Sequence, residues 1–96
     1  MPFFKVVWTN TAKFSLDFYC DLIAEESPEN AKKVRKEIID SSKNLSKYPL
    51  KFQLDEYYPE NNGNIRRYFR WDYRIVYEVR DSIVIILDVQ HSKNVY

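Results

Sequence analysis

The chain has 96 residues, 45% of them hydrophobic and 17% aromatic, and its 15 lysines and arginines nearly balance 14 acidic residues. This composition suits one domain, residues 1–96, with its own core, and the formal net charge of +1 excludes a chain-wide basic surface for nucleic acid. The lone cysteine excludes an intramolecular disulfide, and no apolar run approaches the roughly 20 residues that span a membrane. We therefore expect a cytoplasmic protein with no cofactor, no metal and no membrane partner.

The first half of the chain predicts a strand followed by two helices. The stretch FFKVVW, residues 3–8, is short and rich in β-branched and aromatic residues, which favours a strand. Thr9 and Asn10 are candidate N-caps for a helix whose apolar face carries Ala12, Leu16, Tyr19 and Ile23. Ser27 can cap a second helix that begins at Pro28 and whose apolar face carries Ala31, Val34, Ile38 and Leu45. Two such helices joined by a short turn predict a helical hairpin laid on a sheet.

The second half predicts three strands after a turn-rich segment. Residues 50–58, LKFQLDEYY, could hold an extended stretch, and PENNGN after them is typical of a loop. Strands are predicted at residues 64–71, 73–80 and 82–91, with turns at Asp72 and at residues 80–82. The last strand is apolar on both sides, which favours a central position. The order β-α-α-β-β-β predicts an α+β fold of two layers, an N-terminal strand and helical hairpin followed by a three-stranded antiparallel meander.

Arginines gather on the predicted strands. Alternation places two pairs on the side that we expect to pack on the helices, Phe69 with Trp71 and Ile75 with Tyr77. The opposite face would then carry Arg66, Tyr68, Arg70 and Arg74. Guanidinium groups beside an aromatic ring suit a phosphate and a stacked base, but arginine is also ordinary on a solvated sheet face. The spacing alone leaves both interpretations open.

Other candidate reactive residues are few. His91, the single histidine, ends a central strand and could exchange a proton near neutral pH or act as a structural hydrogen-bonding group. Asp55 and Glu56 form an acidic step in a loop, and neither they nor Asp88 have the spacing of a metal motif. The single glycine excludes a glycine-rich phosphate loop.

Three stretches carry a family resemblance. YRIVYEV at residues 73–79 and IVIILDVQH at 83–91, after an arginine-bearing strand, resemble the C-terminal half of the RelE/ParE superfamily of toxins. VVWTNTAKFSLD at residues 6–17 is similar to that family's first strand and the start of its helical hairpin. These are toxins of type II toxin–antitoxin modules, and the resemblance implies a RelE-like fold, a curved antiparallel sheet with a helical hairpin on one side.

The resemblance implies one of two activities. The RelE-like branch cleaves mRNA on the ribosome, and the ParE-like branch inhibits DNA gyrase without catalysis. Cleavage is the favoured interpretation because one site could gather five residues, namely Arg66, Tyr68, Arg70, Arg74 and His91. An inactive member that only binds its antitoxin is a further alternative.

The mRNA-cleavage hypothesis assigns roles to eight residues, of which the resemblance supplies Arg66, Arg70, Arg74, His91 and Tyr96. Arg74 matches the arginine of the family's YR step, and together with Arg70 it would stabilise the phosphate. His91 would act as acid or base, and Tyr96 would stack on a base or transfer a proton. The remaining positions would bind RNA, namely Arg66, Arg67, Tyr68 and Lys93.

Each active branch implies an antitoxin encoded nearby. We expect it to wrap an extended or helical segment over the helical hairpin, the sheet edge or the basic face. Exposed aromatic residues are candidate anchors for that segment, namely Tyr48, Tyr57 and Tyr58.

Overall fold

The structure is a computed structural model, and it describes residues 3–59 and 61–92. The elements are β1 (Lys5–Trp8), α1 (Asn10–Glu26), α2 (Pro28–Asn44), β2 (Ile65–Arg70), β3 (Tyr73–Arg80) and β4 (Ile83–His91). The order β-α-α-β-β-β and the α+β class are as the sequence predicts.

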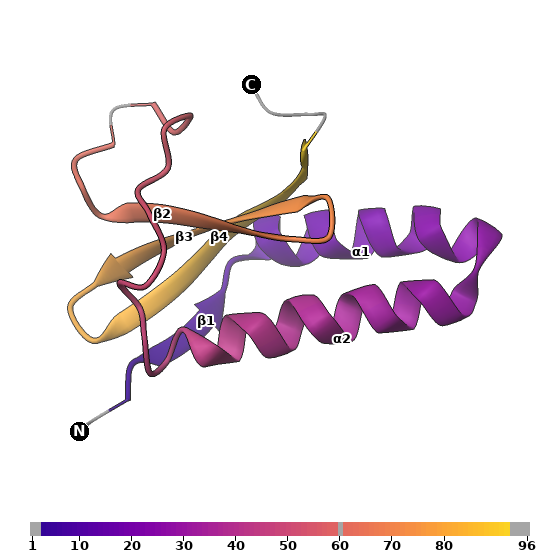
Figure 1. Ribbon diagram of the computed structural model, residues 1–96, viewed down its shortest axis with the longest axis horizontal. Coiled ribbons are helices and arrows are strands. Elements are labelled where there is room, and N and C mark those ends of the chain that lie inside the picture. The colour runs from indigo at the N-terminus through magenta and orange to yellow at the C-terminus, as the bar shows by residue number, and fades with distance from the viewer. Residues whose placement is uncertain (1–2, 60, 93–96) are drawn as a thin grey trace.

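The four strands form one sheet in the order β1-β4-β3-β2. β2, β3 and β4 make the antiparallel meander, and β1 pairs in parallel with β4 from Lys5 opposite Ile83 to Trp8 opposite Ile86. The predicted central position of the last strand is confirmed, since β4 lies between β1 and β3. In Figure 1 the two helices run side by side, and the turn between them projects well beyond the sheet.

Side-chain caps start both helices where the sequence predicts. The Thr9 hydroxyl accepts a hydrogen bond from the amide of Ala12 at 3.0 Å, and it lies 3.0 Å from the carbonyl oxygen of Ile86, to which it can donate. Ser27 caps α2 by accepting from the amide of Asn30 at 3.2 Å, and Pro28 takes the first helical turn. Thr9 therefore fixes the start of α1 on the central strand. Neither helix of the described residues is long and apolar enough to cross a membrane.

The core lies between the hairpin and one face of the sheet, which we call the helix-side face. Leu16 and Cys20 of α1 and Ile38 of α2 pack with side chains of β3 and β4, among them Ile75, Tyr77, Val84, Ile86 and Val89. The prediction that Ile75 and Tyr77 face the helices is confirmed, since both belong to the core cluster that contains Leu16 and Ile38. The opposite side of the sheet is called the outer face below.

The predicted faces of β2 are wrong. Tyr68 is 2% exposed and belongs to the core, whereas Phe69 is 42% exposed and lies on the outer face. The cause is the β2–β3 turn, which contains two residues, Trp71 and Asp72, so that Arg70 pairs with Tyr73 and Tyr68 with Ile75. A strand running to Trp71 with a one-residue turn would have shifted the register by one, and such a shift exchanges the two faces. Trp71 itself is half exposed beside α2.

Burial of two core tyrosines predicts a loss of stability in alkali. Burial raises the pKa of Tyr68 and of Tyr77 to about 12. In the unfolded chain both would ionise near pH 10. Between these values the unfolded chain binds fewer protons than the folded chain, so the free energy of unfolding falls as pH rises from about 10 to about 12.

The measurement is urea unfolding at about pH 8 and about pH 11, for the wild type and three variants. Tyr68→Phe and Tyr77→Phe should each lose less stability between the two pH values than the wild type does. Tyr48→Phe is the control, because Tyr48 is 63% exposed and should leave the difference unchanged. A Tyr77→Phe variant as pH-sensitive as the wild type would contradict the assignment.

Candidate functional site

A strap, residues 49–57, wraps around the edge of the sheet at β2. On the helix-side face the Tyr77 hydroxyl donates to the carbonyl of Pro49 at 2.8 Å, and the Phe52 ring stacks on Tyr68 with centroids 4.6 Å apart. At the edge, the amide of Arg67 donates to the carbonyl of Gln53 at 3.1 Å. The strap then reaches the outer face, so it covers the first half of an otherwise open strand edge. The extended stretch that the sequence suggested here is limited to an isolated bridge between Leu54 and Arg66.

Arg74 anchors the strap on the outer face. Its Nε and Nη2 donate to the two carboxylate oxygens of Asp55 at 3.0 and 2.7 Å, and both side chains are fully buried. The ring of Tyr57 lies 5.5 Å from the guanidinium carbon. A fork-to-fork pair of this kind is strong and directional, and removal of either partner leaves the other charge buried without compensation. The guanidinium of Arg74 is therefore committed to the fold and closed off from solvent.

Two arginines of β2, Arg66 and Arg67, are also bonded to the strap. Arg67 lies on the outer face, where its Nη2 donates to Glu56 at 3.0 Å and its guanidinium stands 5.1 Å from the Phe69 ring centroid. Arg66 donates from Nη1 to the carbonyl of Phe52 at 2.6 Å. Each arginine holds a different residue of the strap, which fixes the path of the strap over β2.

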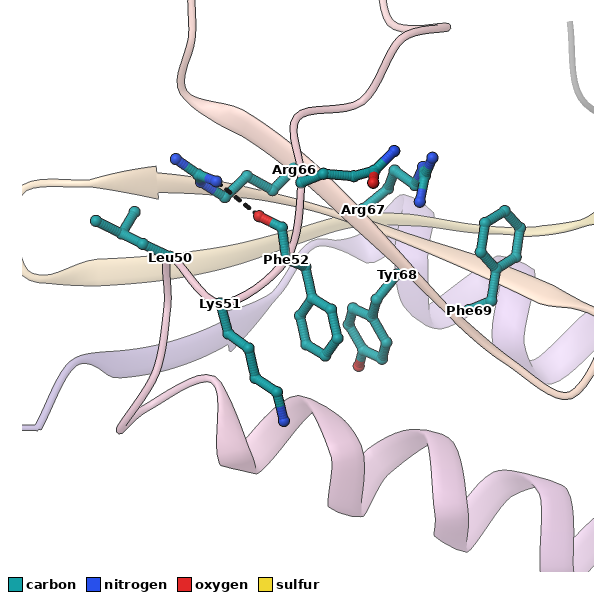
Figure 2. A pocket seen from close by; sticks show the side chains of 8 residues that line it. Leu50, Lys51, Phe52, Arg66, Arg67, Tyr68 and Phe69 are labelled. Atoms are coloured by element: carbon teal, nitrogen blue, oxygen red, sulfur yellow. Dashed lines mark hydrogen bonds between the residues drawn. The ribbon is translucent and has the colours of Figure 1, made fainter.

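A pocket of about 520 Å³ opens between the strap and β2, lined by Leu50, Lys51, Phe52, Gln53, Arg66, Arg67, Tyr68 and Phe69. Figure 2 shows the Phe52 and Tyr68 rings facing each other and Arg66 reaching across to the Phe52 carbonyl. Lys51 places its Nζ 5.3 Å from the centroid of the Phe52 ring. The lining residues carry three cations and no carboxylate, and of the three only Arg67 forms an ion pair within the described residues, with Glu56 beside the pocket, so this pocket suits an anionic or polar segment of a partner.

Three more of the predicted residues, Tyr68, Arg70 and His91, lie on the helix-side face. His91 pairs with Tyr73, the two rings meet edge to face at 5.2 Å, and Tyr19 of α1 approaches the imidazole at 6.4 Å. The guanidinium of Arg70 lies 5.3 Å from the Tyr68 ring and donates to the carbonyl of Phe69 at 3.0 Å. Tyr68 is enclosed in the core, where its hydroxyl lies 2.7 Å from that of Ser41.

The structure does not bring the predicted catalytic residues together. His91 pairs with Tyr73, so these two side chains share the helix-side face. Arg74 is the next residue after Tyr73, and because side chains alternate along a strand it points to the outer face. The prediction that Arg66, Tyr68, Arg70 and Arg74 share one face is wrong, since Arg74 lies opposite the other three. Lys93 and Tyr96 lie outside the described residues.

Sequence reasoning missed the role of Asp55, which it left as part of an acidic step in a loop. The available signal was Arg74 itself, because an arginine between Tyr73 and Ile75 in a strand of buried residues requires a carboxylate partner. Within the described residues, no group of three or more His, Cys, Asp or Glu side chains could hold a metal ion.

Comparison with known proteins places the chain in a family. The sequence model described as "ParE toxin of type II toxin-antitoxin system, parDE" matches residues 6–96. The chain belongs to the ParE toxin family. The resemblance to the RelE/ParE superfamily is thereby confirmed, and the chain is a type II toxin of that superfamily. A search of curated proteins finds no significant match.

Two solved structures share the fold. A chain of the chromosomal ParDE TA system from P. aeruginosa has 22% identity and a TM-score of 0.73, and the match covers 93% of this chain and 96% of that chain. A chain of the toxin–antitoxin complex RelBE2 from Mycobacterium tuberculosis has 22% identity and a TM-score of 0.62, with 95% and 99% covered. Both therefore agree with the predicted RelE-like architecture.

Removal of the strap anchor should destabilise the protein strongly. We expect Asp55→Ala to lower the free energy of unfolding by about 3–5 kcal/mol, because it strands the buried guanidinium of Arg74. Glu56→Ala is the matched control, since it removes the neighbouring ion pair with Arg67, in which the Glu56 side chain is 47% exposed. That change should cost at most about 1 kcal/mol. Urea unfolding of the full chain measures both.

The double variant Asp55→Ala with Arg74→Met should recover much of the loss, because it removes the stranded charge as well. Equal costs for Asp55→Ala and Glu56→Ala would show that the buried pair does not hold the strap.

Proposed function

We propose that this chain is a growth-inhibiting toxin that acts by binding DNA gyrase, and that it does not cleave mRNA. The observation that carries the proposal is the state of Arg74. The predicted nuclease needs this guanidinium at the phosphate, but it is buried and bonded to Asp55. The ParE description of the family points in the same direction. Gyrase inhibition is a binding function, so it needs no acid, base and phosphate-binding group converging on one atom.

Two further observations support binding over catalysis. His91 and Arg74 occupy opposite faces of the sheet, whereas an acid–base group must come within hydrogen-bond reach of the reacting atoms. The formal net charge of +1 is small for a protein that would hold RNA mainly through phosphate contacts.

We further propose that an antitoxin encoded by a neighbouring gene binds this toxin. Both similar solved structures carry titles that name a toxin–antitoxin system or complex. The antitoxin would keep the toxin inactive in the cytoplasm until it is removed, and the cationic pocket beside the strap is a candidate surface for it.

The test is a gyrase supercoiling assay with purified protein, run beside a cell-free translation reaction in which primer extension follows the mRNA. We expect supercoiling to fall as protein is added while the message stays intact. Cuts in ribosome-bound message with normal supercoiling would overturn the proposal and restore mRNA cleavage.

The variant His91→Ala separates the two mechanisms in cells. Its side chain contacts rings at the margin of the core, so the fold should survive, which circular dichroism checks. A gyrase-binding toxin should keep its toxicity in this variant, whereas a nuclease that uses His91 as acid or base should lose about 100-fold or more in rate. Arg70→Ala serves as a second variant for the same comparison.

A further inference from the structure

An apolar stripe runs along the side of α1 that faces away from the core. Its three side chains are strongly exposed: Phe14 by 78%, Phe18 by 59% and Leu22 by 48%. They follow one another at intervals of four residues, so they are neighbours on the helix surface. The opposite side of α1 buries Leu16 and Cys20 against the sheet. The stripe is therefore a surface feature that the fold of one chain does not use.

The stripe is as large as the largest apolar patch on an ordinary monomer. If an aromatic side chain presents about 150–250 Å², the three exposed fractions together amount to roughly 350 Å². Contiguous apolar patches of about 300–600 Å² are the largest on ordinary monomers and often mark an interaction site. A surface of this kind calls for a partner.

The spacing of the stripe is the same in both directions from Phe18. Phe14 lies four residues before it and Leu22 four residues after it. A contact with two-fold symmetry requires a surface that is complementary to itself. When a second α1 is placed antiparallel across Phe18, that side chain meets the partner's Phe18, and Phe14 meets the partner's Leu22. Both ends of the stripe then find an apolar neighbour.

The charges of α1 favour the same antiparallel arrangement. The first half of the helix carries Lys13 and Asp17, which is paired with Arg35 of α2, and the second half carries three carboxylates, Asp21, Glu25 and Glu26. In an antiparallel pair, the acidic half of each helix faces the first half of the other, where the helix dipole is positive. These carboxylates centre six residues from Phe18, so at 1.5 Å per residue the two acidic halves lie about 18 Å apart along the axis, which exceeds the Debye length of about 8 Å. A parallel pair would set carboxylate against carboxylate.

We propose that two copies of this chain associate through the outward faces of their α1 helices, antiparallel, with Phe18 at the two-fold axis. The helical hairpin projects beyond the sheet, which leaves these faces accessible (Figure 1). The stripe and its polar border are small beside the roughly 800 Å² per partner of a stable interface. The dimer is therefore weak, and its population depends on protein concentration. This inference does not rest on the gyrase proposal.

Analytical ultracentrifugation of the full chain over a concentration series tests the association. We expect the wild type to shift from monomer to dimer as the concentration rises through roughly 1–100 µM. Phe18→Glu should keep the chain monomeric, because it places two carboxylates at the two-fold axis. Phe3→Glu is the matched control, since Phe3 is 64% exposed and lies off the stripe, and it should dimerise like the wild type. A wild type that stays monomeric throughout overturns the proposal and assigns the stripe to a different protein or to a lipid surface.

Disulfide trapping tests the orientation. Phe18→Cys should form a covalent dimer under mild oxidation, whereas Phe14→Cys alone should not, because its neighbour in the antiparallel pair is the partner's Leu22. The native Cys20 is buried and serves as the background in both variants. Equal trapping of Phe14→Cys and Phe18→Cys would contradict the antiparallel arrangement.

Discussion

The pairing of Arg70 with Tyr73 across a two-residue turn decides which side chains of β2 share a face of the sheet with those of β3. Trp71 stands in that turn with a φ of 55°, a conformation that costs a residue with a side chain roughly 1–2 kcal/mol. Contacts with α2 help to hold it, since its indole nitrogen donates to Glu37 and the Lys33 ammonium stands 5.3 Å from its ring. Because side chains alternate along a strand and Tyr68 pairs with Ile75, this one pairing sends Tyr68 into the core, on the face opposite Arg74.

The position of Arg74 has a structural consequence beyond its own strand. A guanidinium that is closed off from water requires a carboxylate with matching geometry, and Asp55 supplies it from a segment with little regular structure. The strap has only a short stretch of backbone pairing with β2. It is thus held mainly by specific side chains. The strap in turn closes half of an exposed sheet edge and shapes the cationic pocket beside it.

The same alternation bears on how the toxin acts. A catalytic centre needs its groups on one surface, and here the sheet itself separates Arg74 from His91. A binding surface has no such requirement, and the molecule offers two of different character. One is the pocket of cations and aromatic rings beside β2, and the other is the apolar stripe with acidic neighbours on α1. Because they lie on different elements, a partner at one surface and a second copy at the other are compatible.

The sequence by itself determined the element order, both helix caps, the central place of β4 and the toxin superfamily, because each depends on local periodicity, capping chemistry or short motifs. It did not determine the faces of β2, since a difference of one residue in the turn exchanges them and both lengths suit the residues WD. Nor could it pair Arg74 with Asp55, which lie 19 residues apart in the chain and meet only after the strap has crossed the sheet edge. The tertiary structure alone decided whether an arginine of β3 faces a ligand or holds the fold together, because burial and the nearest carboxylate are properties of packing in space.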